Sequence, residues 1–313
     1  MSLLVEQEAA PAFLDSLEAI LALKARRQRA SVEAADRAAA APVAELPRTA
    51  LAWAERYRQI EGVPFSLERF RPLRALYEDT HPRICVLKPA QRGVSEWAIT
   101  YAGLALEQGA RLWAPPEVPK DGLNVAYIFP TRDALQDFSK ERFTALEDET
   151  PHLRALFGAP GEYDDVTFKQ VGRSYLYLRG GWSESALLSF PADVLILDEY
   201  DRLDHKAVAL ARRRLNASVV RREVAISTPT LPETGIHALY GASDQHRYEQ
   251  PCPHCGTWNR YDYFRDVRAA EGEPGMAGLA AVLYEDWRQW PRDRLLRARW
   301  FLACPACRCA LDD

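Results

Sequence analysis

The stretch from Arg83 to Glu96, R-I-C-V-L-K-P-A-Q-R-G-V-S-E, constrains the fold of this 313-residue chain more than any other. It begins with an apolar run, Ile84 to Leu87, of the kind that forms a buried parallel strand. A loop with a proline and a glycine follows, and Ser95 opens an amphipathic segment that we expect to be a helix. Strand, glycine loop, serine and helix are the order of a phosphate-binding loop, in which helix amides hold an anion and the hydroxyl can ligate Mg²⁺. The competing interpretation is an ordinary strand-turn-helix unit.

The loop departs from the usual pattern G-x-x-x-x-G-K-S/T. If Gly93 and Ser95 take the last glycine and the hydroxyl positions, the lysine position holds Val94 and the first glycine position holds Lys88. The loop therefore keeps a lysine but supplies it from the end of its strand. We predict that the phosphate-contacting residues of this loop are Lys88, Gln91, Arg92, Gly93, Val94 and Ser95.

A second stretch, Asp193 to Asp204, supports the same interpretation. Val194 to Leu197 is another buried-strand pattern, and it ends in Asp198 and Glu199. A carboxylate pair at the C-terminal end of a parallel strand lies where ligands bind in open α/β sheets. We expect Asp198 to hold Mg²⁺ together with the loop serine, and Glu199 to orient and deprotonate an attacking water. The alternative is a strand that stops at a charged turn.

The remaining apolar runs complete the predicted fold. Leu123–Pro130 and Glu223–Ile226 have the composition of core strands, and 167–171 with 174–178 alternate as a hairpin. Helical patterns lie between them, notably at 132–146 and 206–217. Strands that alternate with helices indicate an α/β fold, a mainly parallel sheet with helices on both faces. With the phosphate loop, we predict a RecA/ASCE-like P-loop NTPase fold.

The region before the first core strand divides into two parts. We expect residues 1–47 to form a helical arm or a partly frayed tail. Phe65, Phe70 and Tyr77 come just before the strand that leads into the phosphate loop. In many NTPases such a segment packs on the adenine, and the alternative is simple packing of a helix that precedes a strand.

The charge balance limits the choice of partners. With a net charge of −4, this is no uniformly basic nucleic-acid coat, so a polyanion site must be a local patch. Candidates for such a patch are Arg212, Arg213, Arg214, Arg221 and Arg222, although a solvated helix face would look the same. No stretch approaches the ~18 apolar residues of a membrane span, and the N-terminus lacks a signal-peptide pattern. We therefore expect a cytoplasmic protein without a membrane partner.

The C-terminal part carries a different signal. Five of the six cysteines fall between Cys252 and Cys309, clustered rather than spread like a disulfide framework. Cys252–Cys255 and Cys304–Cys307 are two C-x-x-C knuckles, 48 residues apart, and together they predict a tetrahedral, structural Zn²⁺ site. Cys309 could replace Cys307 as the fourth ligand. We expect an ATPase domain over 48–250 and this small zinc module with four cysteine ligands over 251–313.

Several of these motifs together resemble the ATPase part of the large terminase subunit of lambda-like tailed phages. The resemblance extends over roughly residues 50 to 309 and keeps the family's order of motifs. Its residues are Trp53-Ala54-Glu55-Arg56, Lys88 to Glu96, Phe129-Pro130-Thr131, Leu197 to Asp201, Ser227-Thr228-Pro229-Thr230, and Cys252 to Gly256.

The resemblance implies an ATP-hydrolysing motor that drives double-stranded viral DNA into a procapsid. Its cofactors would be ATP, Mg²⁺ and structural Zn²⁺. Its partners would be double-stranded DNA, the small terminase subunit, the portal of the procapsid and further copies in a ring, in the cytoplasm of an infected bacterial host. Lys88 would serve as the early lysine of the family's deviant phosphate loop, and Ser227 and Thr228 would couple hydrolysis to DNA movement. Arg92, Arg142 and Arg179 are candidates for a phosphate-contacting or trans-acting arginine, and the alternative for each is an arginine without such a role.

The resemblance is incomplete at its C-terminal end. Full-length members continue into an RNase-H-like nuclease, whereas this chain stops at Asp313, so we expect a fragment, a split gene product or an expressed domain. A helicase-like or DNA-repair P-loop ATPase with a zinc ribbon is the alternative, but it would need a second RecA-like lobe. A non-enzymatic zinc-ribbon adaptor is a third interpretation, against which the intact Lys88, Ser95, Asp198 and Glu199 argue.

Overall fold

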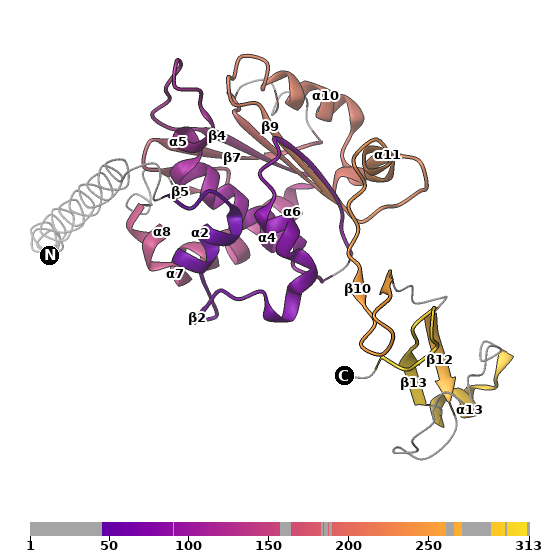
Figure 1. Cartoon of the computed structure of the whole chain (residues 1–313). Coiled ribbons are helices and arrows are strands. Elements are labelled where there is room, and N and C mark those ends of the chain that lie inside the picture. Colours follow the sequence, from indigo (N-terminus) through magenta and orange to yellow (C-terminus); the bar gives the residue numbers. More distant parts are fainter. Residues whose placement is uncertain are drawn as a thin grey trace, which may run out of the picture. The chain divides into compact units, whose positions relative to one another are not determined.

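The structure is a computed structural model of the whole chain (Figure 1). It describes residues 46–311 except for 90, 157–163, 183, 185–186, 188–189, 261–265, 271–288 and 298. The predicted arm over 1–47 therefore lies outside the described residues, apart from its last two positions. The chain divides into two compact units, Met1–Asp244 and Gln245–Asp313, and each is described by itself.

The first unit is built from short helices and strands in alternation. In chain order they are α2 (Ala50–Tyr57), β1 (Gln59–Ile60), β2 (Val63–Pro64), η2 (Glu68–Leu73), α3 (Arg74–Glu78), β3 (Arg83–Leu87), α4 (Val94–Leu104), η3 (Ala105–Gly109), α5 (Ala110–Trp113), β4 (Asn124–Phe129), α6 (Arg132–Asp137), η4 (Phe138–Phe143), α7 (Thr144–Glu149), α8 (Pro151–Leu156), β5 (Asp164–Asp165), β6 (Phe168–Val171), β7 (Ser174–Gly180), β8 (Val194–Asp198), η5 (Tyr200–Arg202), α10 (His205–Arg213), β9 (Arg222–Ser227) and α11 (Gly235–Gly241).

A seven-stranded sheet with the order β3-β9-β8-β4-β7-β6-β5 organises this unit. The first five strands in that order run parallel to one another, and β6 and β5 continue antiparallel. The predicted strands, the hairpin and the mainly parallel sheet are confirmed. Because β3, β9 and β8 are parallel neighbours, their C-terminal ends meet at one edge of the sheet.

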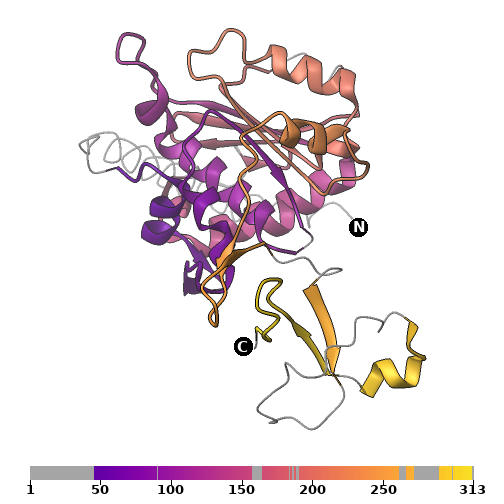
Figure 2. The ribbon, with the colours of Figure 1, turned by 45° about the vertical axis from the view of Figure 1, so that its right-hand side comes forward.

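The two faces of the sheet are buried under different helices (Figures 1 and 2). In β8, Val194 and Ile196 belong to one apolar cluster, and Leu195 and Leu197 belong to another, as expected when side chains alternate along a strand. The first cluster includes residues of α2, α4 and η4, and the second includes residues of α10 and α11. The prediction of helices on both faces is therefore confirmed.

The helix that follows the phosphate loop is held by its apolar composition rather than by a narrow apolar stripe. Trp97, Ala98 and Ile99 of α4 are each fully buried, as is Trp53 of α2, which packs against it. Where Gly103 of α4 faces Trp53, a side chain larger than hydrogen would collide with the indole. This close approach fixes the position of α4, and with it the position of the loop that precedes the helix.

Two predicted boundaries need correction. We predicted the second strand of the hairpin over 174–178, but β7 runs to Gly180, because its last residues pair with β4 on the side away from β6. We expected a helix over 206–217, but α10 ends at Arg213 and turns follow. Among the described residues, none of the helices is long and apolar enough to cross a membrane.

In the described residues of the second unit, the structure shows two small antiparallel pairs and a short helix. Its elements are β10 (Gln250–Pro251), β11 (Trp258–Asn259), β12 (Val267–Ala270), α13 (Arg292–Arg297) and β13 (Arg299–Leu302). β10 pairs with β11, and β12 pairs with β13. The division predicted at residue 250 stays a prediction.

Candidate active site

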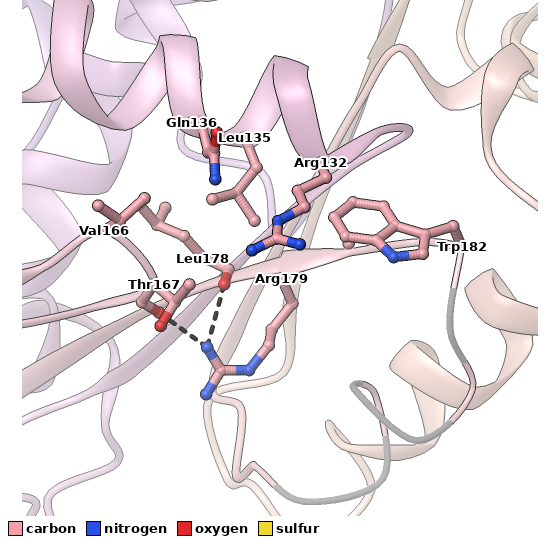
Figure 3. Close-up of a pocket in the computed structure, with 9 residues that line it drawn as sticks. Arg132, Leu135, Gln136, Val166, Thr167, Leu178, Arg179 and Trp182 are labelled. Atoms are coloured by element: carbon pink, nitrogen blue, oxygen red, sulfur yellow. Dashed lines mark hydrogen bonds between the residues drawn. The ribbon is translucent and has the colours of Figure 1, made fainter.

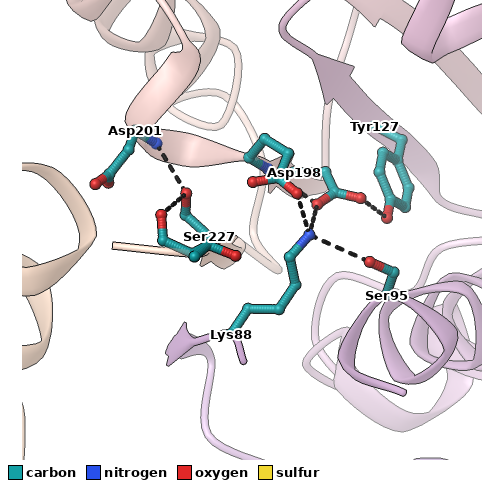
Figure 4. A network of polar contacts seen from close by, with 8 residues as sticks. Lys88, Ser95, Tyr127, Asp198, Asp201 and Ser227 are labelled. Atoms are coloured by element: carbon teal, nitrogen blue, oxygen red, sulfur yellow. Dashed lines mark hydrogen bonds and ion pairs between the residues drawn. The ribbon is translucent and has the colours of Figure 1, made fainter. Parts of the chain in front are cut away.

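Lys88 stands at the centre of a polar cluster at the C-terminal edge of the parallel strands (Figure 4). It follows β3 directly, and its backbone N–H donates to Ser227 O at 2.7 Å, which continues the pairing of β3 with β9. Its Nζ lies 3.3 Å from Ser95 Oγ, 3.0 Å from Asp198 Oδ1 and 2.6 Å from Glu199 Oε1. One ammonium group therefore joins the phosphate loop to the carboxylate pair, across 110 positions of sequence in the case of Asp198.

Asp198 is held in this cluster from a second side. It is the last residue of β8, and its side chain is 8% exposed. Tyr127, in the middle of the neighbouring strand β4, donates its hydroxyl to Asp198 Oδ2 at 3.0 Å. Burial raises the pKa of Tyr127 well above its usual value, and the negative charge of Asp198 raises it further. The tyrosine therefore keeps its proton and remains a donor to the carboxylate.

Glu199 has an unusual backbone that aims its side chain at the lysine. Its φ and ψ are 50° and 51°, in the left-handed region that residues with a β-carbon seldom adopt. Its N–H donates to Asp198 Oδ1 at 2.9 Å, and its carbonyl accepts from Arg202 N at 2.8 Å in the turn η5. With its side chain 29% exposed, Glu199 is the more accessible of the two carboxylates. A backbone held in a sparsely populated region is common at functional sites.

The phosphate loop itself has the geometry that a strand-to-helix turn needs. Gly93 has a φ of 79°, where glycine is strongly favoured, and α4 begins at the next residue. Val94, which takes the lysine position of the usual pattern, is 2% exposed and belongs to the apolar core, so its side chain cannot replace that lysine. Gln91 and Arg92 are exposed, and Gln91 also has a left-handed backbone. The first amides of a helix lack intrahelical partners and are suited to an anion.

The donor set around Lys88 fits a hydrated magnesium ion. Ser95 Oγ and Asp198 Oδ1 both lie within hydrogen-bond distance of the same cationic nitrogen, so they converge on one point. A hydroxyl and a carboxylate oxygen are hard ligands of the kind that Mg²⁺ prefers, and the ion usually keeps several waters. The residues predicted to hold Mg²⁺ are therefore close enough together to share it.

The three aromatic residues predicted for the adenine region differ in exposure. Phe65 and Tyr77 are buried, with ring centroids 5.2 Å apart, and they belong to the core. Phe70 is 39% exposed, and its Cδ1 lies 3.9 Å from the position that a β-carbon on Gly93 would take. Phe70 therefore has exposed ring surface beside the phosphate loop, whereas the rings of Phe65 and Tyr77 are packed in the core. An adenine contact stays a prediction.

The predicted coupling residues lie at the end of β9, beside the carboxylate strand: Ser227 is the last residue of β9, and Thr228 follows it. Ser227 is fully buried, and its Oγ accepts from Asp201 N at 3.2 Å and donates to Thr228 O at 3.1 Å. Thr228 is exposed. Ser227 thus contacts both sides of the site, because its carbonyl also accepts from the backbone of Lys88. The role of Ser227 and Thr228 in coupling stays a prediction.

The three candidate phosphate or trans-acting arginines are placed differently. Arg92 and Arg142 are exposed, and the charge of Arg142 acts on the pKa of Tyr127, which it lowers against the larger effect of burial. Arg179 lines a pocket of about 380 Å³ with Arg132 and Trp182 (Figure 3). Its Nη1 donates to the carbonyls of Thr167 and Leu178, at 2.7 and 3.0 Å.

One arginine proposed for a basic patch is not at the surface. Arg222 is 6% exposed, its Nε donates to Tyr101 Oη at 2.7 Å, and its guanidinium lies over the Trp113 ring at 4.1 Å. The prediction that Arg222 contacts a polyanion is wrong, because its side chain is buried in the core. Arg212 forms an ion pair with Glu223, with a shortest distance of 2.6 Å. Arg213 and Arg221 are exposed.

The second unit brings its two cysteine knuckles together. The Sγ atoms of Cys252, Cys255, Cys304 and Cys307 all lie within 4.8 Å of one another. Two of these pairs, Cys252–Cys307 and Cys255–Cys304, are 3.8 Å apart. Four thiolates at ~2.3 Å from Zn²⁺ in a tetrahedron have sulfurs about 3.8 Å apart, so the cluster fits this ion.

The backbone around the cysteines supports the same arrangement. Each knuckle is closed by a hydrogen bond to the carbonyl of its first cysteine, from Gly256 N at 2.9 Å and from Arg308 N at 2.8 Å. Asn259 Nδ2 lies 3.4 Å from Cys304 Sγ, as expected for a donor to a metal-bound sulfur. Cys309 lies outside the group of four, and its Sγ is 3.9 Å from Cys307 O.

Sequence reasoning missed two residues of the site. Tyr127 was noted only as part of a core strand, although a hydroxyl inside an otherwise apolar strand needs a buried partner. Asp201 was quoted in a motif without a role, yet its carboxylate accepts from Thr230 and Ile236. An acidic residue two positions after the carboxylate pair was the available signal.

A comparison with known protein families finds a match over most of the chain. A family described as phage terminase large subunit gpA, ATPase domain, matches residues 61–313. Among curated proteins, no sequence matches this chain.

Solved structures of large terminases are also similar. The HK97 bacteriophage large terminase is 12% identical, with a TM-score of 0.48 over 61% of this chain and 40% of that chain. The large terminase ATPase domain of Thermus phage P74-26 is 18% identical, with a TM-score of 0.36 over 56% and 71%. The large terminase of the thermophilic bacteriophage D6E is 14% identical, with a TM-score of 0.33 over 53% and 39%. This chain thus spans less than half of the HK97 terminase.

Proposed function

This chain belongs to the family of ATPase domains of the phage terminase large subunit gpA, as its motifs predicted, and on that premise we propose that its site hydrolyses ATP. The observation that supports the proposal best is the Lys88 ammonium, which contacts Ser95, Asp198 and Glu199 at once. These are the residue types that phosphoryl transfer requires: a lysine for the phosphates, a hydroxyl and a carboxylate for the metal ion, and a carboxylate for the water.

Nucleotide binding would exchange the partners of Lys88. Its ammonium forms ion pairs with both carboxylates, and its own side chain is 11% exposed. The phosphates of ATP, held by the first amides of α4, carry more negative charge and lie at the same edge of the sheet. Lys88 would turn to the phosphates, and this movement would release Glu199 for catalysis.

The metal site would form from the groups that Lys88 leaves. Ser95 and Asp198 would hold Mg²⁺, directly or through waters, with the hydroxyl of Tyr127 keeping Asp198 in place. Held by these two residues, the ion would supply positive charge against the negative charge that develops on the transferred phosphoryl group.

Glu199 would act as the general base. Its carboxylate would orient a water in line with the γ-phosphorus and accept a proton from it while the water attacks. The bond between the γ-phosphorus and the oxygen bridging to the β-phosphate breaks, so the products are ADP and inorganic phosphate. The greater exposure of Glu199, compared with Asp198, leaves room for this water.

In the family, this chemistry belongs to a motor that packages DNA. We propose that the chain drives double-stranded DNA into a procapsid as a ring of copies, with the small terminase subunit and the portal as partners, in the cytoplasm of an infected bacterial host. Arg213 and Arg221 are exposed candidates for DNA phosphates, a contact that would weaken with salt. Ser227 and Thr228 would link hydrolysis to DNA movement, since they join the end of β9 to the carboxylate strand.

We also propose that the second unit binds one structural Zn²⁺. Cys252, Cys255, Cys304 and Cys307 would supply four thiolates, which is a closed site without a position for substrate. Metal binding would then stabilise the fold of this unit, because its short antiparallel pairs bury little apolar surface of their own.

A conservative substitution at the base tests the proposed activity. Glu199→Gln keeps the size of the side chain but cannot accept the proton of the water, so we expect hydrolysis to fall by about 100-fold or more. Binding of a fluorescent ATP analogue should be retained. Glu141→Gln, at an exposed position of η4, is the matched control and should hydrolyse ATP like the unaltered chain. Unchanged turnover of Glu199→Gln at saturating ATP would exclude Glu199 as the base.

A further inference from the structure

Asp201 connects three segments that are separate in sequence. Its N–H donates to Ser227 Oγ at 3.2 Å (Figure 4). Its Oδ2 accepts from Thr230 N at 2.9 Å and from Thr230 Oγ1 at 3.0 Å, and its Oδ1 accepts from Ile236 N at 2.6 Å. A single residue of the turn after β8 therefore holds the loop after β9 and the start of α11.

The neighbouring backbone is shaped to let this carboxylate approach. Gly235, the first residue of α11, has a φ of 50°, and a β-carbon there would collide with the Asp201 carboxylate. The N-cap residue of the helix, Thr234, makes no side-chain capping bond to it. Asp201 therefore takes the role at the start of α11 that a residue of the helix itself usually has. Both observations indicate that the position of α11 depends on this contact.

Hydrogen bonds also connect Asp201 to the nucleotide site. Glu199 and Asp201 belong to one tight turn, in which Arg202 N donates to Glu199 O at 2.8 Å. Ser227, which accepts from Asp201, also accepts the backbone N–H of Lys88 through its carbonyl. A hydrogen-bonded path therefore runs from Lys88 through Ser227 to Asp201, and from there to Thr230 and Ile236.

We propose that Asp201 is a positioning residue that transmits the state of the nucleotide site to residues 228–236. The inference rests on the proposed function, since it requires Lys88 to leave Glu199 when nucleotide binds. Loss of that ion pair frees the turn that carries Glu199 and Asp201. Because Asp201 holds both Thr230 and Ile236, the loop after β9 and the start of α11 follow the movement of the turn.

Two substitutions separate this role from ordinary helix capping. Asp201→Asn retains the size of the side chain but replaces one acceptor oxygen with an NH₂ donor, so it cannot accept from Thr230 and Ile236 together. Asp204→Ala is the matched control, three residues away, because one oxygen of Asp204 accepts both amides and an asparagine there would keep the cap. The Asp204 carboxylate also accepts from two backbone amides, Lys206 N at 2.6 Å and Ala207 N at 3.2 Å, but at the start of α10.

Steady-state ATP hydrolysis by the full 313-residue chain gives the first readout. We expect Asp201→Asn to lower kcat by at least about tenfold, the factor that loss of a hydrogen bond to a charged group can produce, with KM changed less than about twofold. Asp204→Ala should also lower the melting temperature, because it removes the cap of α10, and should leave kcat within about twofold. An Asp201→Asn kcat no lower than that of Asp204→Ala would overturn the proposal.

Hydrogen exchange of the Thr230 and Ile236 amides gives a second readout that needs only nucleotide binding. In the unaltered chain, a non-hydrolysable ATP analogue with Mg²⁺ should change the exchange rates of these two amides. In Asp201→Asn that response should be lost, although the analogue still binds. A response that persists in Asp201→Asn would overturn the proposal. If the unaltered chain bound nucleotide but did not hydrolyse it, the proposed ATPase function would be rejected. The hydrogen-exchange measurement would then be the test of the proposal for Asp201.

Discussion

Substitution of Lys88 by alanine would test the central cluster most directly, because it removes the cation that is ion-paired with two carboxylates. Lys88 and Asp198 are 11% and 8% exposed at their side chains, so this ion pair is largely buried, whereas Glu199 is 29% exposed. Without the ammonium, Asp198 and Glu199 face each other with only the Tyr127 hydroxyl and a backbone N–H as donors. We therefore expect the variant to be destabilised when no nucleotide is added.

The size of the effect follows from the burial of the two pairs. Removal of one partner from a buried ion pair costs about 3–5 kcal/mol, because the remaining charge is left uncompensated. The pair with Glu199 adds little, since partly exposed pairs contribute at most about 1 kcal/mol. A loss of about 3 kcal/mol corresponds to a melting temperature lower by about 6–12 °C for a domain of this size.

The assay compares Lys88→Ala with a variant that breaks a similar pair elsewhere. Lys120 forms an ion pair with Asp193 at 2.6 Å, and Asp193 is 3% exposed at its side chain. Asp193 immediately precedes the first residue of β8, whereas Asp198 is the last residue of the same strand. Lys120→Ala should therefore also lower the melting temperature while it leaves ATP affinity unchanged. Lys88→Ala should weaken ATP binding at least tenfold, since it also removes the positive charge that would contact the phosphates.

Magnesium gives a further contrast between the two variants. In Lys88→Ala, Mg²⁺ alone should raise the melting temperature, because the vacated carboxylates can bind the ion without displacing an ammonium group. The same concentration should have a smaller effect on the unaltered chain and on Lys120→Ala. A Lys88→Ala protein that melts like the unaltered chain and binds ATP with equal affinity would refute the reasoning about this cluster.

Two further substitutions test other parts of the molecule. Tyr127→Phe should cost about 1–2 kcal/mol of unfolding free energy, measured by urea titration, because Asp198 loses a buried donor. The raised pKa of Tyr127 means that the tyrosine stays protonated in the fold, so its contribution is lost only as the pH rises above the unfolded value of about 10. The cost should therefore be constant between about pH 6 and 9, and a steep change there would contradict the assignment. Purified protein should contain one equivalent of zinc by metal analysis, and Cys255→Ser should lose it while Cys309→Ser retains it, because Cys309 lies outside the group of four. Equal loss of zinc from both variants would mean that the fourth ligand is wrongly assigned.

The local features of this protein were determined by sequence alone. Apolar runs such as Val194 to Leu197 form strands because they can be buried on both faces of a parallel sheet, and the structure places a fully buried strand there. Gly93 at the turn before α4, and the two C-x-x-C knuckles, are also local, since each depends on the conformation of a few consecutive residues. For these features, residue type and spacing were sufficient.

The relations between distant segments were decided only by the tertiary structure. Tyr127 reaches Asp198 because β4 and β8 are paired neighbours in a particular register, and a change of one residue in that register would turn the hydroxyl to the other face. The sequence predicted that Arg222 belongs to a basic surface patch, but its guanidinium lies over the Trp113 ring in the core. Asp201 acquires its four hydrogen bonds only when the turn after β8, the loop after β9 and the start of α11 are assembled. The order and register of the strands depend on packing of the whole sheet, and no short stretch of sequence contains that information.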